Sequence, residues 1–111
     1  MSFRIEYFNE RVEATIADWP DDILADYARL IKLLADHGPD LRMPHSRAFG
    51  DGLFELRAKS ASGIGGAFSC FVRGRRITVL HSFIKKTQHT PARQLKIARQ
   101  RQKVILQNVR S

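Results

Sequence analysis

Residues 77–91 read ITVLHSFIKKTQHTP, and this stretch decides how the rest of the chain is organised. Its first part is apolar and rich in β-branched residues, a pattern that predicts a buried strand. The strand ends at two lysines, Lys85 and Lys86, and a Thr90–Pro91 step that is typical of a helix start follows. The junction therefore brings positive charge, an imidazole and side-chain amides to one place.

The residues before this stretch predict one strand and two helices. Apolar and polar residues alternate over residues 3–7, which indicates a short half-buried strand. Helical spacing of apolar residues predicts a helix over residues 10–18 with Asn9 as its cap, and a second from residue 21 or 22 to Gly38. The two helices should form an αα-hairpin whose apolar stripe needs a sheet to cover it.

The second half predicts three strands and a final helix. Strand-like segments cover residues 53–59, 64–72 and 76–84, and the short loops between them favour antiparallel hairpins. Residues 91–109 predict a long basic helix. The order β-α-α-β-β-β-α predicts an α+β fold, with a small, mostly antiparallel, twisted sheet and helices on one face. We expect residues 1–111 to form one domain.

Between the two halves, residues 39–52 are rich in proline and glycine, which predicts a surface loop. Its basic members Arg42, His45 and Arg47 could rim a site.

Composition is that of a soluble protein, with 43% hydrophobic and 27% charged residues among 111. No apolar run approaches the roughly 18 residues that span a bilayer, and the first residues lack the apolar stretch of a signal peptide. A single cysteine, Cys70, fits a reducing compartment, and its apolar neighbours favour a buried, inert thiol. We therefore expect a cytoplasmic protein.

Charge divides the chain at Glu55. All 11 acidic residues lie at or before this position, together with 6 basic residues, whereas the remainder holds 13 basic residues and no acidic one. Such asymmetry predicts a polyanionic partner for the second half. The alternative is a solvated basic helix without a partner.

Four basic residues could converge on one sheet face: Arg57 on one strand, and His81, Lys85 and Lys86 on or just after another. By strand alternation, His81 and Lys85 share a face opposite Leu80. Guanidinium, ammonium and imidazole groups together suit a phosphodiester, and RNA cleavage through the 2′-hydroxyl needs such groups but no metal in principle. The four histidines lack metal-ligand spacing, so we expect neither a metal nor another cofactor.

Each of these residues also has a structural explanation. A strand histidine such as His81 is often hydrogen-bonded within the core. Arg57 could pair with Glu55 or Glu6, and the two lysines could mark a solvated strand end.

Four segments carry a resemblance to a known family. They are GLFELR at residues 52–57, GRRI at residues 74–77, LHSFIKKTQ at residues 80–88, and the Thr90–Pro91 step that opens the basic helix. In this order, over residues 3–109, the chain resembles the phage-derived HigB-type branch of the RelE/ParE toxin superfamily. The F-x-K-K-T-Q-x-T-P run is the most specific part of the match.

The resemblance implies a bacterial or prophage toxin of a type II toxin–antitoxin system. Such a toxin is a ribosome-dependent endoribonuclease that cleaves mRNA in the ribosomal A site, in contact with 16S rRNA. A helix-turn-helix antitoxin neutralises it. Arg57 and Lys85–Lys86 fall at positions that the superfamily uses for basic active-site residues, so we expect them to stabilise the phosphorane while His81 transfers a proton. The expected RNA-binding residues are Lys59, Arg73, Arg75, Arg76, Gln88 and His89.

One departure from the family pattern bears on catalysis. Relatives usually carry an aromatic residue and an arginine at the start of the middle strand, where this chain has Gly65–Gly66. Loss of an arginine that holds the scissile phosphate would cost about 2–4 kcal/mol of transition-state stabilisation. The chain could be a weak toxin, a prophage relic that binds RNA or ribosomes without cleaving, or a toxin in which Arg73, Arg75 or Arg76 substitutes. Action on DNA gyrase, as in ParE-type relatives, is a further alternative.

Overall fold

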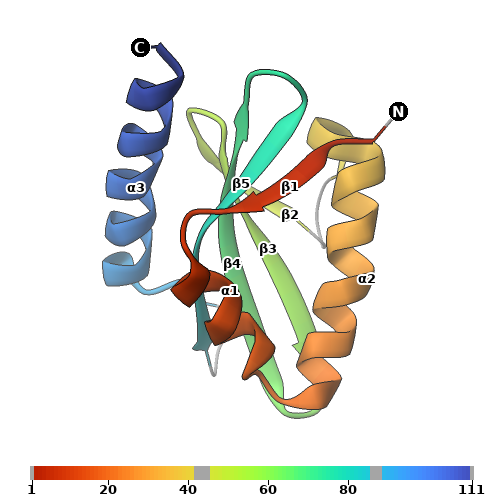
Figure 1. Ribbon diagram of the computed structural model, residues 1–111. Coiled ribbons are helices and arrows are strands. Elements are labelled where there is room, and N and C mark those ends of the chain that lie inside the picture. Colours follow the sequence, from red (N-terminus) through yellow and green to blue (C-terminus); the bar gives the residue numbers. More distant parts are fainter. Residues whose placement is uncertain (1, 42–45, 86–88, 111) are drawn as a thin grey trace.

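The computed structural model describes residues 2–41, 46–85 and 89–110, and these residues form three α-helices and a five-stranded sheet (Figure 1). The strand order is β1-β5-β4-β3-β2, with β1 parallel to β5 and all other neighbours antiparallel. The predicted α+β class and mostly antiparallel sheet are confirmed. The elements are β1 (Arg4–Tyr7), α1 (Glu10–Ala17), α2 (Asp21–His37), a short 3-10 turn η1 (Gly38–Asp40), β2 (Ser46–Gly50), β3 (Leu53–Ser60), β4 (Gly63–Val72), β5 (Arg76–Lys85) and α3 (Ala92–Arg110).

Local signals place most of these elements correctly. The side chain of Asn9 accepts a hydrogen bond of 2.9 Å from the backbone amide of Val12, as expected of the cap of α1. Helix α2 begins at Asp21 and ends at Gly38, which has a φ of 56°. None of the helices in the described part of the chain is long and apolar enough to cross a membrane.

The predicted surface loop at residues 39–52 is wrong in part, because it contains the edge strand β2. This strand pairs with β3, so that Arg47 lies opposite Glu55 in the sheet. A hairpin is possible because the Gly50–Gly52 turn has positive φ at all three of its positions, including 55° at Asp51. Arg42 and His45, the other two basic residues expected at a rim, lie outside the described residues.

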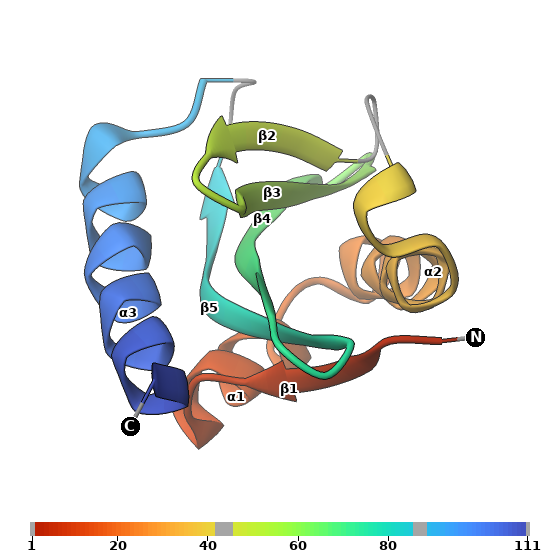
Figure 2. The same ribbon diagram turned by 90° about the horizontal axis from the view of Figure 1, so that it is seen from above.

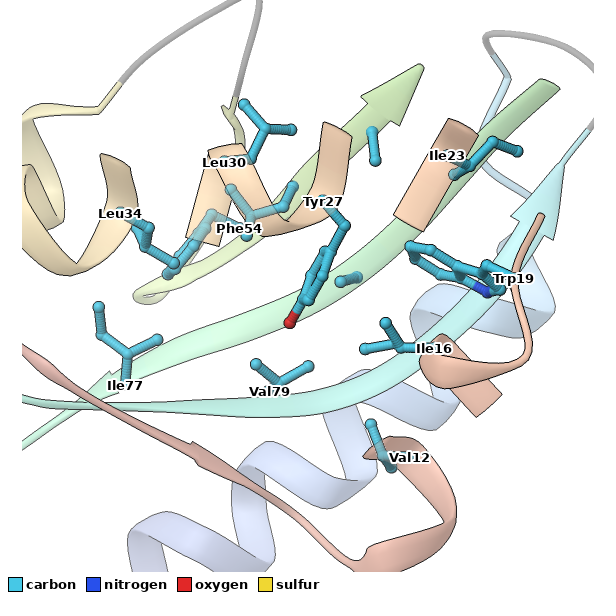
Figure 3. Close-up of a cluster of buried hydrophobic side chains, with 13 residues drawn as sticks. Val12, Ile16, Trp19, Ile23, Tyr27, Leu30, Leu34, Phe54, Ile77 and Val79 are labelled. Carbon is cyan, nitrogen blue, oxygen red and sulfur yellow. The ribbon is translucent and has the colours of Figure 1, made fainter. Parts of the chain in front are cut away.

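One face of the sheet carries the larger core, shown in Figure 3. Helices α1 and α2 place their apolar stripes against alternate residues of β3, β4 and β5. The inward-facing apolar stripe that the helical spacing predicts for these two helices is thus confirmed. The buried members are Val12, Ile16, Trp19, Ile23, Tyr27, Leu30 and Leu34 from the helical layer, and Phe54, Leu56, Ala58, Ala67, Ile77 and Val79 from the strands.

Helix α3 lies on the opposite side of the sheet, so the helices do not all share one face as predicted (Figure 2). Its only fully buried apolar residue among those described is Ala98, which packs with Phe68 and Phe83. Polar side chains supply much of the remaining attachment. Arg99 donates to the carbonyls of Phe49 and Gly50, Arg101 to that of Leu80, and Gln102 to that of Asp51. Part of the basic side of this helix therefore binds the sheet instead of facing only solvent.

A β-bulge in β5 decides which side chains face α3. Phe68 of β4 pairs with His81, whereas the next residue, Ser69, pairs with Val79, so Leu80 is the extra residue. Before the bulge, Val79 faces the core under α1 and α2. After it, Phe83 faces α3, and Leu80 lies in the same cluster. The expectation that Leu80 lies on the face opposite His81 and Lys85 is wrong, because simple alternation does not hold across a bulge.

Gly65 and Gly66 are both covered by aromatic rings from other segments. A Cβ atom added at Gly65 would lie 2.5 Å from Cζ3 of Trp19, and one at Gly66 would lie 2.7 Å from Cζ of Phe83. The two rings come from opposite faces of the sheet, because Trp19 belongs to the core under α1 and α2 and Phe83 to the cluster under α3. The glycine pair therefore allows both rings to approach the backbone of β4.

Gly65→Ala should lower the free energy of unfolding by about 1–3 kcal/mol, because the new methyl group must displace the Trp19 ring from a packed core. Urea denaturation of the variant measures this loss. In a Trp19→Leu background the same substitution should cost much less, because the ring that it strikes is absent. An equal cost in both backgrounds would contradict the proposed contact.

Candidate functional site

Glu55 of β3 is the centre of a buried polar cluster on the face that carries α3. Its side chain is fully buried, and Lys85 Nζ lies 3.1 and 3.2 Å from the two carboxylate oxygens. Arg57 Nε lies 3.5 Å from Oε1 of the same carboxylate. Lys85 and Arg57 are also buried, with exposed fractions of 5% and 8%. The structure therefore brings these two predicted catalytic residues together, but around a carboxylate.

Thr90, just before α3, completes the cluster. Its hydroxyl donates to the Glu55 carboxylate at 3.1 Å and accepts from Lys85 Nζ at 2.9 Å. The sequence predicted Thr90 only as a helix cap. In the structure it ties the start of α3 to β3 and β5.

Two cations, Lys85 and Arg57, contact the carboxylate of this cluster, and a third, Arg47, lies opposite Glu55 on the neighbouring strand. Arg47 on β2 contributes as a charge that lowers the pKa of Lys85, together with Arg57. Burial is the largest cause of that lowering, and the neighbouring Glu55 opposes it by raising the pKa of the same lysine. With Lys85 protonated, the formal charge of Arg47, Arg57, Lys85 and Glu55 is +2. Arg47 is the exposed member, and its guanidinium lies 5.0 Å from the Phe49 ring centroid.

The sequence predicted the residues of this cluster better than their arrangement. The pairing of Arg57 with Glu55 was the structural alternative to a catalytic role, and the 3.5 Å contact confirms it. The alternative of a solvated strand end is wrong for Lys85, which is buried. The central place of Glu55 was missed. The available signal was its position two residues before Arg57, on the same face of one strand.

His81 lies in a separate environment at the bulge of β5. Its Nε2 atom makes a short hydrogen bond to Oε1 of Gln94 on α3, and its ring stacks on Phe83 at 5.9 Å between centroids. Burial, and to a smaller extent the nearby Arg101, lower the pKa of His81 below its usual value, although the bond to Gln94 opposes the shift. The core-histidine alternative is therefore confirmed in part, since the residue is half-buried and bonded.

The distance along β5 separates His81 from the Glu55 cluster. His81 and Lys85 are four residues apart on one strand, which corresponds to roughly 13 Å at about 3.3 Å per residue. Phe83 lies between them in the strand, and its ring contacts both: Lys85 Nζ lies 5.8 Å from the ring centroid, and His81 is stacked on the ring. A general base and a phosphate-binding cation must both contact the same phosphodiester, so these two groups do not form one catalytic site in this conformation.

The predicted RNA-binding residues fall into two regions. Arg73, Arg75 and Arg76 lie at the β4–β5 turn, where Arg76 contacts Glu6 at 3.6 Å and Arg75 lies over the Phe3 ring. Figure 1 shows this turn at the opposite end of the sheet from the end of β5. Ten residues of β5 separate the two ends, or about 30 Å. None of the three arginines can therefore take the place of an arginine at position 66.

Lys59 and His89 are exposed and lie at the same end of the sheet as Lys85, near the end of β3 and before α3 respectively. Lys86 and Gln88, the remaining predicted site residues, lie outside the described residues. Within the described ranges, no group of three or more histidine, cysteine, aspartate or glutamate side chains is placed to hold a metal ion.

Comparison with known families gives one match. A family model described as phage derived protein Gp49-like (DUF891) matches residues 14–103, which include α2, the whole of β2–β5 and most of α3. The chain belongs to this family. The Gp49-like family is associated with toxin-like proteins of the RelE type. A search among curated proteins gives no match.

In this Gp49-like protein, Glu55→Gln should lower the free energy of unfolding by about 3–5 kcal/mol, because it leaves buried cations without their carboxylate. Chemical denaturation at neutral pH measures the change. Glu13→Gln, at an exposed position of α1, is the matched control and should change stability by less than about 0.5 kcal/mol.

The double variant Glu55→Gln/Lys85→Met should recover part of the loss, since it removes the unpaired ammonium group together with the carboxylate. A double variant that is as unstable as the sum of the two single variants would show that Glu55 and Lys85 do not interact.

Proposed function

We propose that this protein is a toxin-like RNA-binding protein related to the HigB-type branch of the RelE/ParE superfamily. Its basic surface around the Glu55 cluster would hold the phosphate backbone of mRNA, in contact with 16S rRNA at the ribosomal A site. A helix-turn-helix antitoxin would be its protein partner, and the cytoplasm its location. Family membership and the acid-free second half of the chain support this proposal.

The observation that carries the proposal is the pair of cations, Lys85 and Arg57, that contacts the buried Glu55 carboxylate, with Arg47 opposite Glu55 on the edge strand β2. Glu55 offsets only one of the positive charges of Arg47, Arg57 and Lys85, so a net positive charge remains on this part of the sheet. Exposed Lys59 on β3 and His89 before α3 lie toward the same end. Such a surface attracts a polyanion without requiring a particular base sequence.

Binding fits the geometry better than cleavage does. Lys85 and Arg57 already contact a carboxylate, and a phosphate would have to compete with Glu55 for them. The Phe83 ring occupies the space above Gly66, where relatives carry the arginine that this chain lacks. His81 lies roughly 13 Å along the strand from Lys85. The groups that a phosphodiester cleavage needs are therefore present but separated.

Arg47→Gln should weaken binding of a mixed-sequence single-stranded RNA and make that binding less dependent on salt. If Arg47 neutralises one phosphate, the slope of log K against log salt should become shallower by about 0.7, the value for one contact to a single strand. Fluorescence anisotropy over a series of salt concentrations measures both quantities.

Arg29→Gln is the matched control, because Arg29 lies on α2, on the other side of the sheet, and pairs with Asp26. It should leave the slope unchanged. Salt-independent binding by the wild type, or equal slopes for the two variants, would contradict an RNA-binding role of this surface.

A second candidate function is ribosome-dependent mRNA cleavage by metal-free attack of the 2′-hydroxyl, and the state of His81 favours it. Gln94 Oε1 can only accept a hydrogen bond, so Nε2 of His81 carries the hydrogen and Nδ1 is unprotonated in the neutral ring. The lowered pKa keeps this form populated near neutral pH. An imidazole in that state can accept the proton of a 2′-hydroxyl.

An in vitro translation reaction with mapped mRNA ends distinguishes the two functions. Under our proposal, the wild type associates with translating ribosomes and generates no new mRNA ends. If instead the wild type cleaves, and His81→Gln slows cleavage by about 10²-fold or more while the exposed His37→Gln does not, the protein is an endoribonuclease that uses His81.

A further inference from the structure

A small cavity lies where α1, β5 and α3 meet, away from the Glu55 cluster. Its volume is about 80 Å³, and its lining includes Arg11 and Thr15 of α1, His81 and Ser82 of β5, and Arg101 of α3. Figure 1 shows α1 and α3 flanking this part of β5. A cavity of this size is well below the several hundred Å³ of a typical small-molecule site, so it suits a group of a few non-hydrogen atoms.

The charges around the cavity are all of one sign. Arg11 and Arg101 each carry a guanidinium, and no carboxylate is among the lining residues of the described chain. Neither arginine has an ion-pair partner among the described residues, unlike Arg57 and Arg76, which each contact a glutamate. Two guanidinium groups beside an imidazole form a donor set that matches a tetrahedral oxyanion.

The fold holds two of these groups in place. Arg101 donates to the carbonyl of Leu80 at 2.8 Å, and its guanidinium lies 4.9 Å from the ring centroid of Phe8. A guanidinium has five N–H donors, so others remain for a ligand. His81 is fixed through Nε2 by Gln94, and its Nδ1 has no hydrogen-bond partner among the described residues.

The hydroxyl groups of the cavity limit what it can bind. Thr15 donates to the carbonyl of Arg11 at 2.8 Å, and Ser82 donates to that of Val12 at 3.2 Å. Both hydroxyl hydrogens are therefore engaged, and the donors for an anion come from the arginines and from protonated His81. Such a set holds a charged oxyanion better than a neutral polar molecule.

We propose that the cavity between α1, β5 and α3 is a phosphate site, in which Arg11 and Arg101 bind a single phosphate group and His81 takes up a proton when the phosphate binds. The phosphate can belong to a nucleic-acid backbone or be free in solution, and the same three residues would recognise it in either case. The site is separate from the RNA surface proposed above, and its existence does not depend on that function.

The test uses the histidine itself as the reporter. A phosphate beside the ring favours the imidazolium, so inorganic phosphate should raise the pKa of His81, as measured by ring NMR on the full chain at constant ionic strength. Arg11 and Arg101 line the same cavity as the ring, Gln94 bonds to it, and Phe68 and Phe83 of the sheet are its neighbours, so no carboxylate among these described groups competes for the imidazolium. Sulfate, which does not titrate in this range, should give the same direction.

Arg11→Gln should weaken phosphate binding about tenfold, as expected for loss of one charge-assisted hydrogen bond. The position is exposed on α1, so the variant should fold normally. Arg29→Gln, an exposed arginine of α2, is the control and should bind phosphate like the wild type. Equal affinity in the two variants, or an unchanged pKa of His81 at millimolar phosphate in the wild type, would overturn the proposal.

Competition identifies the source of the phosphate. A short oligoribonucleotide without terminal phosphates that displaces inorganic phosphate from His81 would assign the cavity to a backbone phosphodiester. Retention of inorganic phosphate while the oligonucleotide is bound elsewhere would assign it to free phosphate. If the oligonucleotide fails to bind at all, the RNA-binding function is wrong, whereas the phosphate site is still decided by the inorganic phosphate titration.

Discussion

The buried carboxylate of Glu55 is the constraint on which the basic side of this molecule depends. An ionised carboxylate without solvent is unstable unless cations and hydrogen-bond donors surround it. Here Lys85, Arg57 and Thr90 fill that role from β5, β3 and the segment before α3. The ion cluster thus fixes the end of β5 relative to β3 and sets where α3 begins. This matters for α3, because the helix buries little apolar surface of its own.

The attachment of α3 explains why its position was harder to predict than its existence. Its length and basic composition follow from the sequence, and so do the hairpins and the caps of α1 and α2. The side of the sheet on which it packs does not, because Arg99, Arg101 and Gln102 bind backbone carbonyls that come into position only when the sheet has formed. The sequence predicts a loop where the edge strand β2 lies, because the Gly50–Gly52 turn dominates the local pattern. In both cases the deciding contacts are tertiary, and no periodic pattern of apolar residues in the sequence predicts them.

The bulge in β5 limits site prediction for the same reason. Strand alternation correctly places His81 and Lys85 on one face, but it also places Leu80 on the other. Because Leu80 is an extra residue, the side chains that follow it point to the opposite face from the one that alternation predicts from the residues before it. The sequence therefore identifies the candidate residues by their chemical type. Which of them lie together depends on the bulge, which strand alternation does not predict. Arg57 and Lys85 form one group with Glu55, and His81 forms another with Gln94 and Arg101. Only the structure separates the Glu55 cluster from the cavity beside His81.

The glycine pair shows why a missing residue cannot be judged from the sequence alone. Gly66 departs from the aromatic–arginine pattern that the family resemblance leads one to expect, and from the sequence alone an arginine at that position would be expected to restore phosphate binding. In this protein the Phe83 ring already lies against the Gly66 backbone, with Phe68 stacked on one side and Lys85 Nζ near its face. An arginine there would have to displace a ring that supports both Lys85 and His81. The absence of an arginine at position 66 and the presence of the Phe83 ring over it are thus one structural feature. The basic groups near position 66 pack around that ring.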